Sequence, residues 1–158
     1  MAKNYWMIAC TLESLKASRE AKLYMQEVTS TYRRRVQRMQ PEDRLLFYVP
    51  SIKKFGGTAT VTAASLEEQR PKEGGRRRIA RYSLKINVRY NTVPDEESFL
   101  DAREIGPRMD YVDRWPPERW NLAFLGQFHM LPRRDFELVE GEINRVTRGS
   151  NPRPPKFS

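Results

Sequence analysis

The chain has 158 residues, of which 29 are Lys or Arg and 20 are Asp or Glu, so its net charge is +9. This length predicts a single domain, and an apolar share of 39% without long apolar runs excludes a membrane-spanning or largely disordered chain. One cysteine and one histidine exclude a disulfide framework and cysteine-rich or histidine-rich metal sites. We therefore expect a cytoplasmic protein without metal or cofactor, whose excess positive charge favours nucleic acid over a membrane surface as partner.

Apolar strands and amphipathic helices alternate in the first half of the chain. Runs rich in apolar residues predict strands at 5–11, 44–49 and 55–63, the last weakened or bulged at its paired glycines. Apolar residues at helical spacing predict helices at 12–23 and 31–39. A turn is expected at 41–43, directly before the second strand.

The second half is more irregular. Composition and periodicity predict an exposed loop at 67–78, a half-buried strand at 79–90, a short helix at 96–103, a helical turn at 116–120, a strand at 122–130 and a helix at 132–143. Residues 147–158 have little to bury, so we expect a domain at 1–146 and a disordered basic tail. The whole pattern predicts an α+β fold, in which short helices pack outside a curved, barrel-like sheet.

Catalytic chemistry finds little support in the sequence. Cys10 with His129 as its base is one candidate nucleophilic pair, because a thiolate needs a neighbouring base or positive field. Cys10, however, lies inside an apolar strand, where a free cysteine ordinarily packs. No nucleotide-binding glycine loop or Walker lysine motif is present.

Basic and aromatic residues give the stronger functional signal. Arginines cluster at Arg33, Arg34, Arg35 and Arg38 and again at Arg76, Arg77 and Arg78. The planar guanidinium suits bidentate contact with phosphate, so we expect these clusters to bind a nucleic-acid backbone. Several of the 17 aromatic residues, such as Tyr24, Tyr48, Phe55 and Trp120, lie near element ends, where they can line a cavity and stack on a flat ligand.

Five segments in order and spacing resemble an EVE domain. They are Asn4–Ile8, the aromatic residue after the first helix, Gln40–Tyr48, Phe55–Val61 and Trp120–Gly126. EVE domains belong to the PUA-like superfamily, together with the YTH domains that read methylated adenine in RNA. The resemblance, which spans 2–143, implies a curved sheet with flanking helices and an aromatic-lined pocket for a modified base.

The resemblance and the aromatic pattern together predict a ligand pocket lined by Trp6, Thr11, Tyr24, Tyr48, Phe55, Gly56, Leu66 and Trp120. Two positions depart from the family pattern: Met25 stands where the family has glycine, and Leu66 stands where relatives often have an aromatic residue. The cage is therefore expected to be incomplete or retuned.

The leading hypothesis is a non-enzymatic reader, in which arginines hold phosphates and the pocket inspects one modified base of DNA or RNA. A small hydrolase acting on a nucleotide or a modified-base metabolite in the same pocket is the alternative. A protein-interaction subunit with basic faces is a third possibility.

Overall fold

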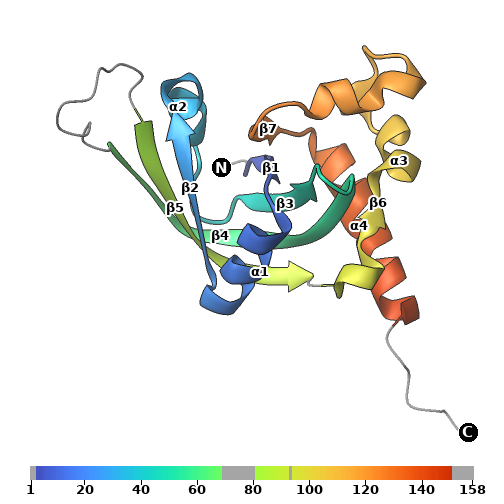
Figure 1. Cartoon of the computed structure of the whole chain (residues 1–158), viewed down its shortest axis with the longest axis horizontal. Coiled ribbons are helices and arrows are strands. Elements are labelled where there is room, and N and C mark those ends of the chain that lie inside the picture. Colours follow the sequence, from blue (N-terminus) through green and yellow to red (C-terminus); the bar gives the residue numbers. More distant parts are fainter. Residues whose placement is uncertain (1–2, 69–80, 93, 151–158) are drawn as a thin grey trace, which may run out of the picture.

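Seven strands and several short helices form the structure, a computed structural model that describes residues 3–68, 81–92 and 94–150 (Figure 1). The strands are β1 (Tyr5–Ala9), β2 (Leu23–Thr29), β3 (Arg44–Val49), β4 (Lys54–Glu68), β5 (Arg81–Thr92), β6 (Leu100–Asp101) and β7 (Phe128–Met130). The α-helices are α1 (Leu12–Ala21), α2 (Ser30–Val36), α3 (Ala102–Ile105) and α4 (Arg133–Ser150). Short 3₁₀ segments are η1 (Glu96–Ser98), η2 (Gly106–Arg108), η3 (Asp110–Val112) and η4 (Pro117–Phe124).

One mixed sheet carries the fold, in the order β2-β5-β4-β3-β1-β7, with β6 paired to β4. β1 and β3 are parallel, and the other pairs are antiparallel. The sheet curls into a half-barrel, so that its two edge strands, β2 and β7, turn toward the same opening (Figure 1). The predicted α+β fold with a curved sheet and flanking helices is confirmed.

The bulge expected at the paired glycines is present between β3 and β4. Phe47 pairs with Gly57 and Tyr48 with Phe55, so Gly56 is the extra residue. A Cβ at Gly56 would lie 2.4 Å from Leu15 Cδ2 of α1, which shows why the helix packs so closely here. The bulge thus seats α1 on the sheet.

Two apolar cores lie on opposite faces of the sheet. Trp6 and Ile8 of β1 belong to the first core, inside the half-barrel with α1 and α2, whereas Met7 belongs to the second. The second core fills the space between the other face and the segments from α3 to α4 (Figure 1). Because side chains alternate along a strand, one strand such as β1 contributes to both cores.

Buried polar contacts join the parts of the sheet. Asp43, only 2% exposed, accepts hydrogen bonds from the backbone N–H of Asn4 at 2.9 Å, Trp6 Nε1 at 3.0 Å and the backbone N–H of Gln40 at 3.0 Å. On the other face, Arg44 pairs with Glu140 of α4. These contacts fix the start of β1 and the position of α4.

Several expected boundaries are wrong. The helix expected at 12–23 ends at Ala21, because Lys22 takes a left-handed conformation with φ 56°, and a separate strand, β2, follows. The strand expected at 122–130 is confined to β7, since η4 continues to Phe124 and Gly126 turns the chain at φ 101°. The helix expected at 96–103 is divided among η1, β6 and α3.

Two long elements also exceed the predicted ranges. β4 continues to Glu68, into the expected loop, and α4 continues to Ser150 rather than Ile143. The predicted phosphate-binding residues Arg76, Arg77 and Arg78 and the tail residues 151–158 lie outside the described residues.

Candidate functional site

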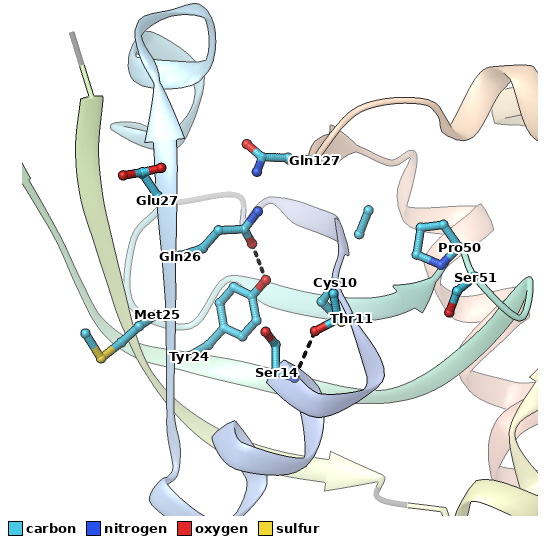
Figure 2. Close-up of a pocket in the computed structure, with 11 residues that line it drawn as sticks. Cys10, Thr11, Ser14, Tyr24, Met25, Gln26, Glu27, Pro50, Ser51 and Gln127 are labelled. Carbon is cyan, nitrogen blue, oxygen red and sulfur yellow. Dashed lines mark hydrogen bonds between the residues drawn. The ribbon is translucent and has the colours of Figure 1, made fainter.

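A cavity of about 540 Å³ opens where the two edges of the half-barrel approach each other (Figure 2). Four segments surround it: the β1–α1 connection, β2, the turn after β3 and the segment before β7. The lining residues are Ala9, Cys10, Thr11, Ser14, Tyr24, Met25, Gln26, Glu27, Pro50, Ser51 and Gln127. Of the predicted pocket residues, the structure brings Thr11 and Tyr24 together here.

The start of α1 forms one side of the cavity. Thr11 is the N-cap residue in extended conformation, and its Oγ1 accepts a hydrogen bond from the backbone N–H of Ser14 at 3.0 Å. Side chains that cap a helix are held in place, so Thr11 presents its hydroxyl to the cavity in a fixed position.

Alternation along β2 forms the facing side. Tyr24 and Gln26 point toward the cavity, and Met25 points to the opposite side of the strand, where it is 54% exposed (Figure 2). The Tyr24 ring packs against Phe47 with centroids 5.7 Å apart, and its hydroxyl donates a hydrogen bond to Gln26 Oε1. Burial raises the pKa of Tyr24, so this hydroxyl stays protonated.

Cys10 contributes a buried thiol to the lining of the cavity. Cys10 is 8% exposed, and its Sγ donates a weak hydrogen bond to the Tyr48 carbonyl at 3.7 Å. Burial raises the pKa of the Cys10 thiol to about 12. The thiol is therefore neutral at physiological pH and contributes packing.

The charge of the lining contrasts with that of the chain. The lining includes no lysine, arginine or histidine, and its one charged residue is Glu27 at the rim. Glu27 forms an ion pair with Arg81 of β5 at 2.9 Å. A neutral group therefore fits the cavity better than a phosphate, which would lack a cationic partner inside it.

The first arginine cluster lies next to this cavity, on α2 and, for Arg38, in the turn that follows it. The backbone N–H of Gln127, a lining residue, donates to Tyr32 Oη of α2 at 3.1 Å. The side chains of Arg33, Arg34 and Arg38 are exposed at this end of the molecule. They present cationic groups to solvent beside a cavity that has none.

In the described part of the chain, Arg35, unlike the other exposed arginines of the cluster, is hydrogen-bonded to the backbone. Its Nη1 donates to the carbonyl of Phe128 in β7 at 2.9 Å, and its guanidinium lies 5.6 Å from the Tyr32 ring centroid. Arg35 thus ties α2 to the edge strand β7. Its predicted role as a phosphate contact competes with this structural contact.

Three of the predicted pocket aromatic residues lie on the other face of the sheet. Tyr48, Phe55 and Trp120 are buried in the second core around Phe124. Tyr48 follows Phe47 in β3, so alternation turns their rings to opposite faces. These aromatic residues pack the sheet against the segments from α3 to α4 and do not line the cavity.

The remaining predicted pocket residues also lie away from the lining. Trp6 is fully buried in the first core and hydrogen-bonded to Asp43, Gly56 lies under α1, and Leu66 of β4 pairs with Leu84. Each serves the packing of the half-barrel. Leu66 does not line this cavity.

The candidate catalytic pair is not assembled. Cys10 belongs to the first core, whereas His129 pairs in register with Met7, which belongs to the second core. His129 Nδ1 contacts Tyr111 Oη at 2.8 Å and its Nε2 contacts the Gly126 carbonyl at 3.3 Å. Burial lowers the pKa of His129, which favours the neutral ring in this structural position.

Sequence reasoning missed the polar residues of the lining, above all Ser14, Gln26 and Gln127. The alternation of Tyr24, Gln26 and Val28 is a strand signal that could have identified Gln26 as inward-facing. No local signal marks Gln127, which reaches the cavity through the pairing of β7 with β1.

Metal-ligand clusters and membrane-spanning helices are both absent from the described residues. No three His, Cys, Asp or Glu side chains there gather as candidate metal ligands. No helix in the described ranges is long and apolar enough to cross a membrane.

Solved structures with the same architecture include YTH and ASCH domains. The Mmi1 YTH domain in complex with RNA has a TM-score of 0.62 and 11% identity, over 97% of this chain and 85% of that one. The YTH domain of Zygosaccharomyces rouxii MRB1 in complex with N6-methyladenosine RNA has a TM-score of 0.58 and 16% identity, over 89% and 86%. An ASCH protein from Zymomonas mobilis has a TM-score of 0.53 and 11% identity, over 87% and 94%.

These similarities show that the fold is the PUA-like α+β fold. No protein-family model matches the chain, and no curated protein sequence matches it. The resemblance to EVE domains in particular stays a prediction.

Proposed function

We propose that this chain binds single-stranded nucleic acid, with RNA as the first candidate, and reads one modified base in the cavity beside β2 without catalysing a reaction. The observation that carries the proposal is the adjacency of two unlike surfaces. A cavity without cationic residues opens next to the exposed arginines of α2, and Tyr32 joins the two through its contact with Gln127.

In this arrangement the arginines supply affinity and the cavity supplies base selectivity. Arginines that contact phosphates supply salt-dependent affinity but no sequence information. A base unstacked from a single strand enters the cavity, where side chains inspect its edge. The YTH domains with the same fold are solved in complex with RNA, one of them with N6-methyladenosine RNA, which supports RNA as the first ligand to test.

The proposal is tested by separating the two surfaces with matched variants. Ser14→Trp places a bulky ring in the mouth of the cavity, and Ala17→Trp places the same ring on an exposed position of α1 outside the lining. We expect Ser14→Trp to abolish any preference among single strands that differ only in one modified base, while general affinity persists. Ala17→Trp should retain the preference.

The arginines are tested by neutralising Arg33, Arg34 and Arg38 together, leaving Arg35 in its structural contact. For single strands the slope of log Kobs against log salt should flatten by about 0.7 for each phosphate that is no longer neutralised, hence by about 2 units. Neutralising Arg108, Arg114 and Arg119, exposed in the η2–η4 region, removes the same charge and serves as the control. If both triple variants flatten the salt dependence equally, α2 is not the surface that contacts phosphates.

A further inference from the structure

We infer that the cavity accepts a base through a carbonyl-bearing edge, so that guanine and uracil derivatives are preferred over adenine derivatives. This inference rests on the proposed function, since it concerns the base that the same cavity reads. It follows from the directions of the hydrogen bonds around the lining. Those bonds leave the donors of Gln26 and Thr11 free to contact a ligand.

The amide of Gln26 is oriented by Tyr24. The Tyr24 hydroxyl donates to Gln26 Oε1, and among the described residues it has no other acceptor (Figure 2). Turning the amide around would leave the hydroxyl proton of a buried ring, 2% exposed, without a partner. The amide NH₂ of Gln26 is therefore the group left to contact a ligand.

Thr11 also presents a donor. Its Oγ1 accepts the backbone N–H of Ser14 at 3.0 Å, which leaves the hydroxyl proton free to turn toward the cavity (Figure 2). The first backbone N–H groups of α1 lack partners within the helix, as at any helix start, and lie on the same side. The donors of Gln26 and Thr11 come from the two facing sides of the cavity.

Two backbone carbonyls beside the lining already accept hydrogen bonds. The Tyr48 carbonyl accepts from the Cys10 backbone N–H at 2.9 Å and from its Sγ at 3.7 Å, and the Gln127 carbonyl accepts from the Ala9 N–H at 2.9 Å. The Glu27 carboxylate lies at the rim, in its ion pair with Arg81. The other polar side chains of the lining, Ser14, Ser51 and Gln127, can turn either to donate or to accept, so the fixed donor of Gln26 decides which base edge fits.

The four bases differ in whether the edge that they present carries hydrogen-bond acceptors or donors. Guanine presents the acceptors O6 and N7, and uracil presents O4, whereas adenine and cytosine present an amino group that donates. An amino group facing the Gln26 NH₂ would oppose donor to donor and leave both desolvated without partners. The cavity therefore rejects N6-methyladenine, whose edge still carries an N–H donor.

The test compares single-stranded RNA oligonucleotides that are identical except for one central nucleotide, at one salt concentration. The central position is abasic, adenine, N6-methyladenine, cytosine, guanine, uracil or 5-methyluracil. We expect the guanine and uracil series to bind wild type about fivefold to a hundredfold more tightly than the adenine series, the range for one well-made base contact. Tightest binding of adenine or N6-methyladenine would overturn the inference.

Variants of Gln26 make the test specific to the proposed donor. Gln26→Glu replaces the NH₂ by an acceptor of the same shape and should invert the ranking toward cytosine and adenine. Gln26→Met should abolish the ranking without inverting it. Asn87→Asp, which adds the same charge at an exposed position outside the lining, should retain it. An unchanged ranking in Gln26→Glu, with thermal unfolding like that of wild type, would overturn the inference.

The abasic oligonucleotide separates this inference from the proposed function. If every central nucleotide, including the abasic one, binds equally to wild type, base reading itself fails. If bases bind more tightly than the abasic site but adenine derivatives rank first, the reader function survives and only the carbonyl preference is refuted.

Discussion

The carboxylate of Asp43 is expected to be one of the most sensitive single positions for stability. It lies 2% exposed and accepts three hydrogen bonds, from Asn4, Trp6 and Gln40. Asp43→Ala leaves these donors without their acceptor, and a buried donor without a partner costs about 1–3 kcal/mol. Trp6 is fully buried, whereas Asn4 and Gln40 are closer to solvent, so we expect a total loss of about 3–4 kcal/mol.

Asp43→Asn provides the graded comparison. Oδ2 accepts from both Trp6 and Gln40, and Oδ1 accepts from Asn4, so an amide can keep the first two hydrogen bonds but not the third. We expect a smaller loss of about 1–2 kcal/mol. Urea unfolding followed by circular dichroism measures both variants, with the exposed Asp113→Ala as a control expected within about 0.5 kcal/mol of wild type. Equal losses for Asp43→Asn and Asp43→Ala, or an Asp43→Ala loss below about 1 kcal/mol, would refute this account.

Three other predictions follow from buried or half-buried ionisable groups. Burial lowers the pKa of His129 below 6.5, so the unfolded chain binds more protons than the folded chain as pH falls through that value. The free energy of unfolding should therefore decrease from pH 7.5 to pH 5. Urea titrations of His129→Gln should show a weaker dependence of this free energy on pH. Burial raises the pKa of Cys10 to about 12, so the contribution of the buried neutral thiol to the free energy of unfolding is complete below about pH 9 and is lost as pH rises toward 12. At pH 8 a thiol reagent should therefore modify the native chain at least about a hundredfold more slowly than the chain in urea. Glu140→Gln should cost about 1–2 kcal/mol by leaving Arg44 without its carboxylate, and a double variant with Arg44→Met should lose less than the sum of the single variants; additive losses would argue against direct coupling.

Local sequence pattern is sufficient for the strongest elements of this fold. β1 and β3 are dense in apolar residues because both faces of each strand are covered by a core, and this density is visible without any tertiary information. The bulge at Gly56 is likewise signalled by the paired glycines. The resemblance to EVE domains also identifies Thr11 and Tyr24, which do meet at the cavity; their contact with a base stays a prediction.

The rest depends on information that one sequence does not contain. An aromatic residue such as Tyr48 or Trp120 has the same local signature whether it faces a ligand or the second core, because the face is decided by register and by the helical layer. β2 escapes prediction because the left-handed turn at Lys22, which divides it from α1, needs neither glycine nor proline. Gln26 and Gln127 become neighbours of one cavity only when the sheet curls.

The open side of the half-barrel has a consequence for how this protein behaves in concentrated solution. β2 pairs with β5 and β7 pairs with β1, so among the described strands each keeps one rim of backbone amides and carbonyls without a partner strand. Such rims invite the strands of another molecule. At the β7 rim, Tyr32 and Arg35 of α2 contact Gln127 and Phe128, and these contacts occupy backbone groups that an incoming strand would pair with. The β7 rim is thus screened against pairing with a second molecule, and loosening α2 should increase self-association through this edge.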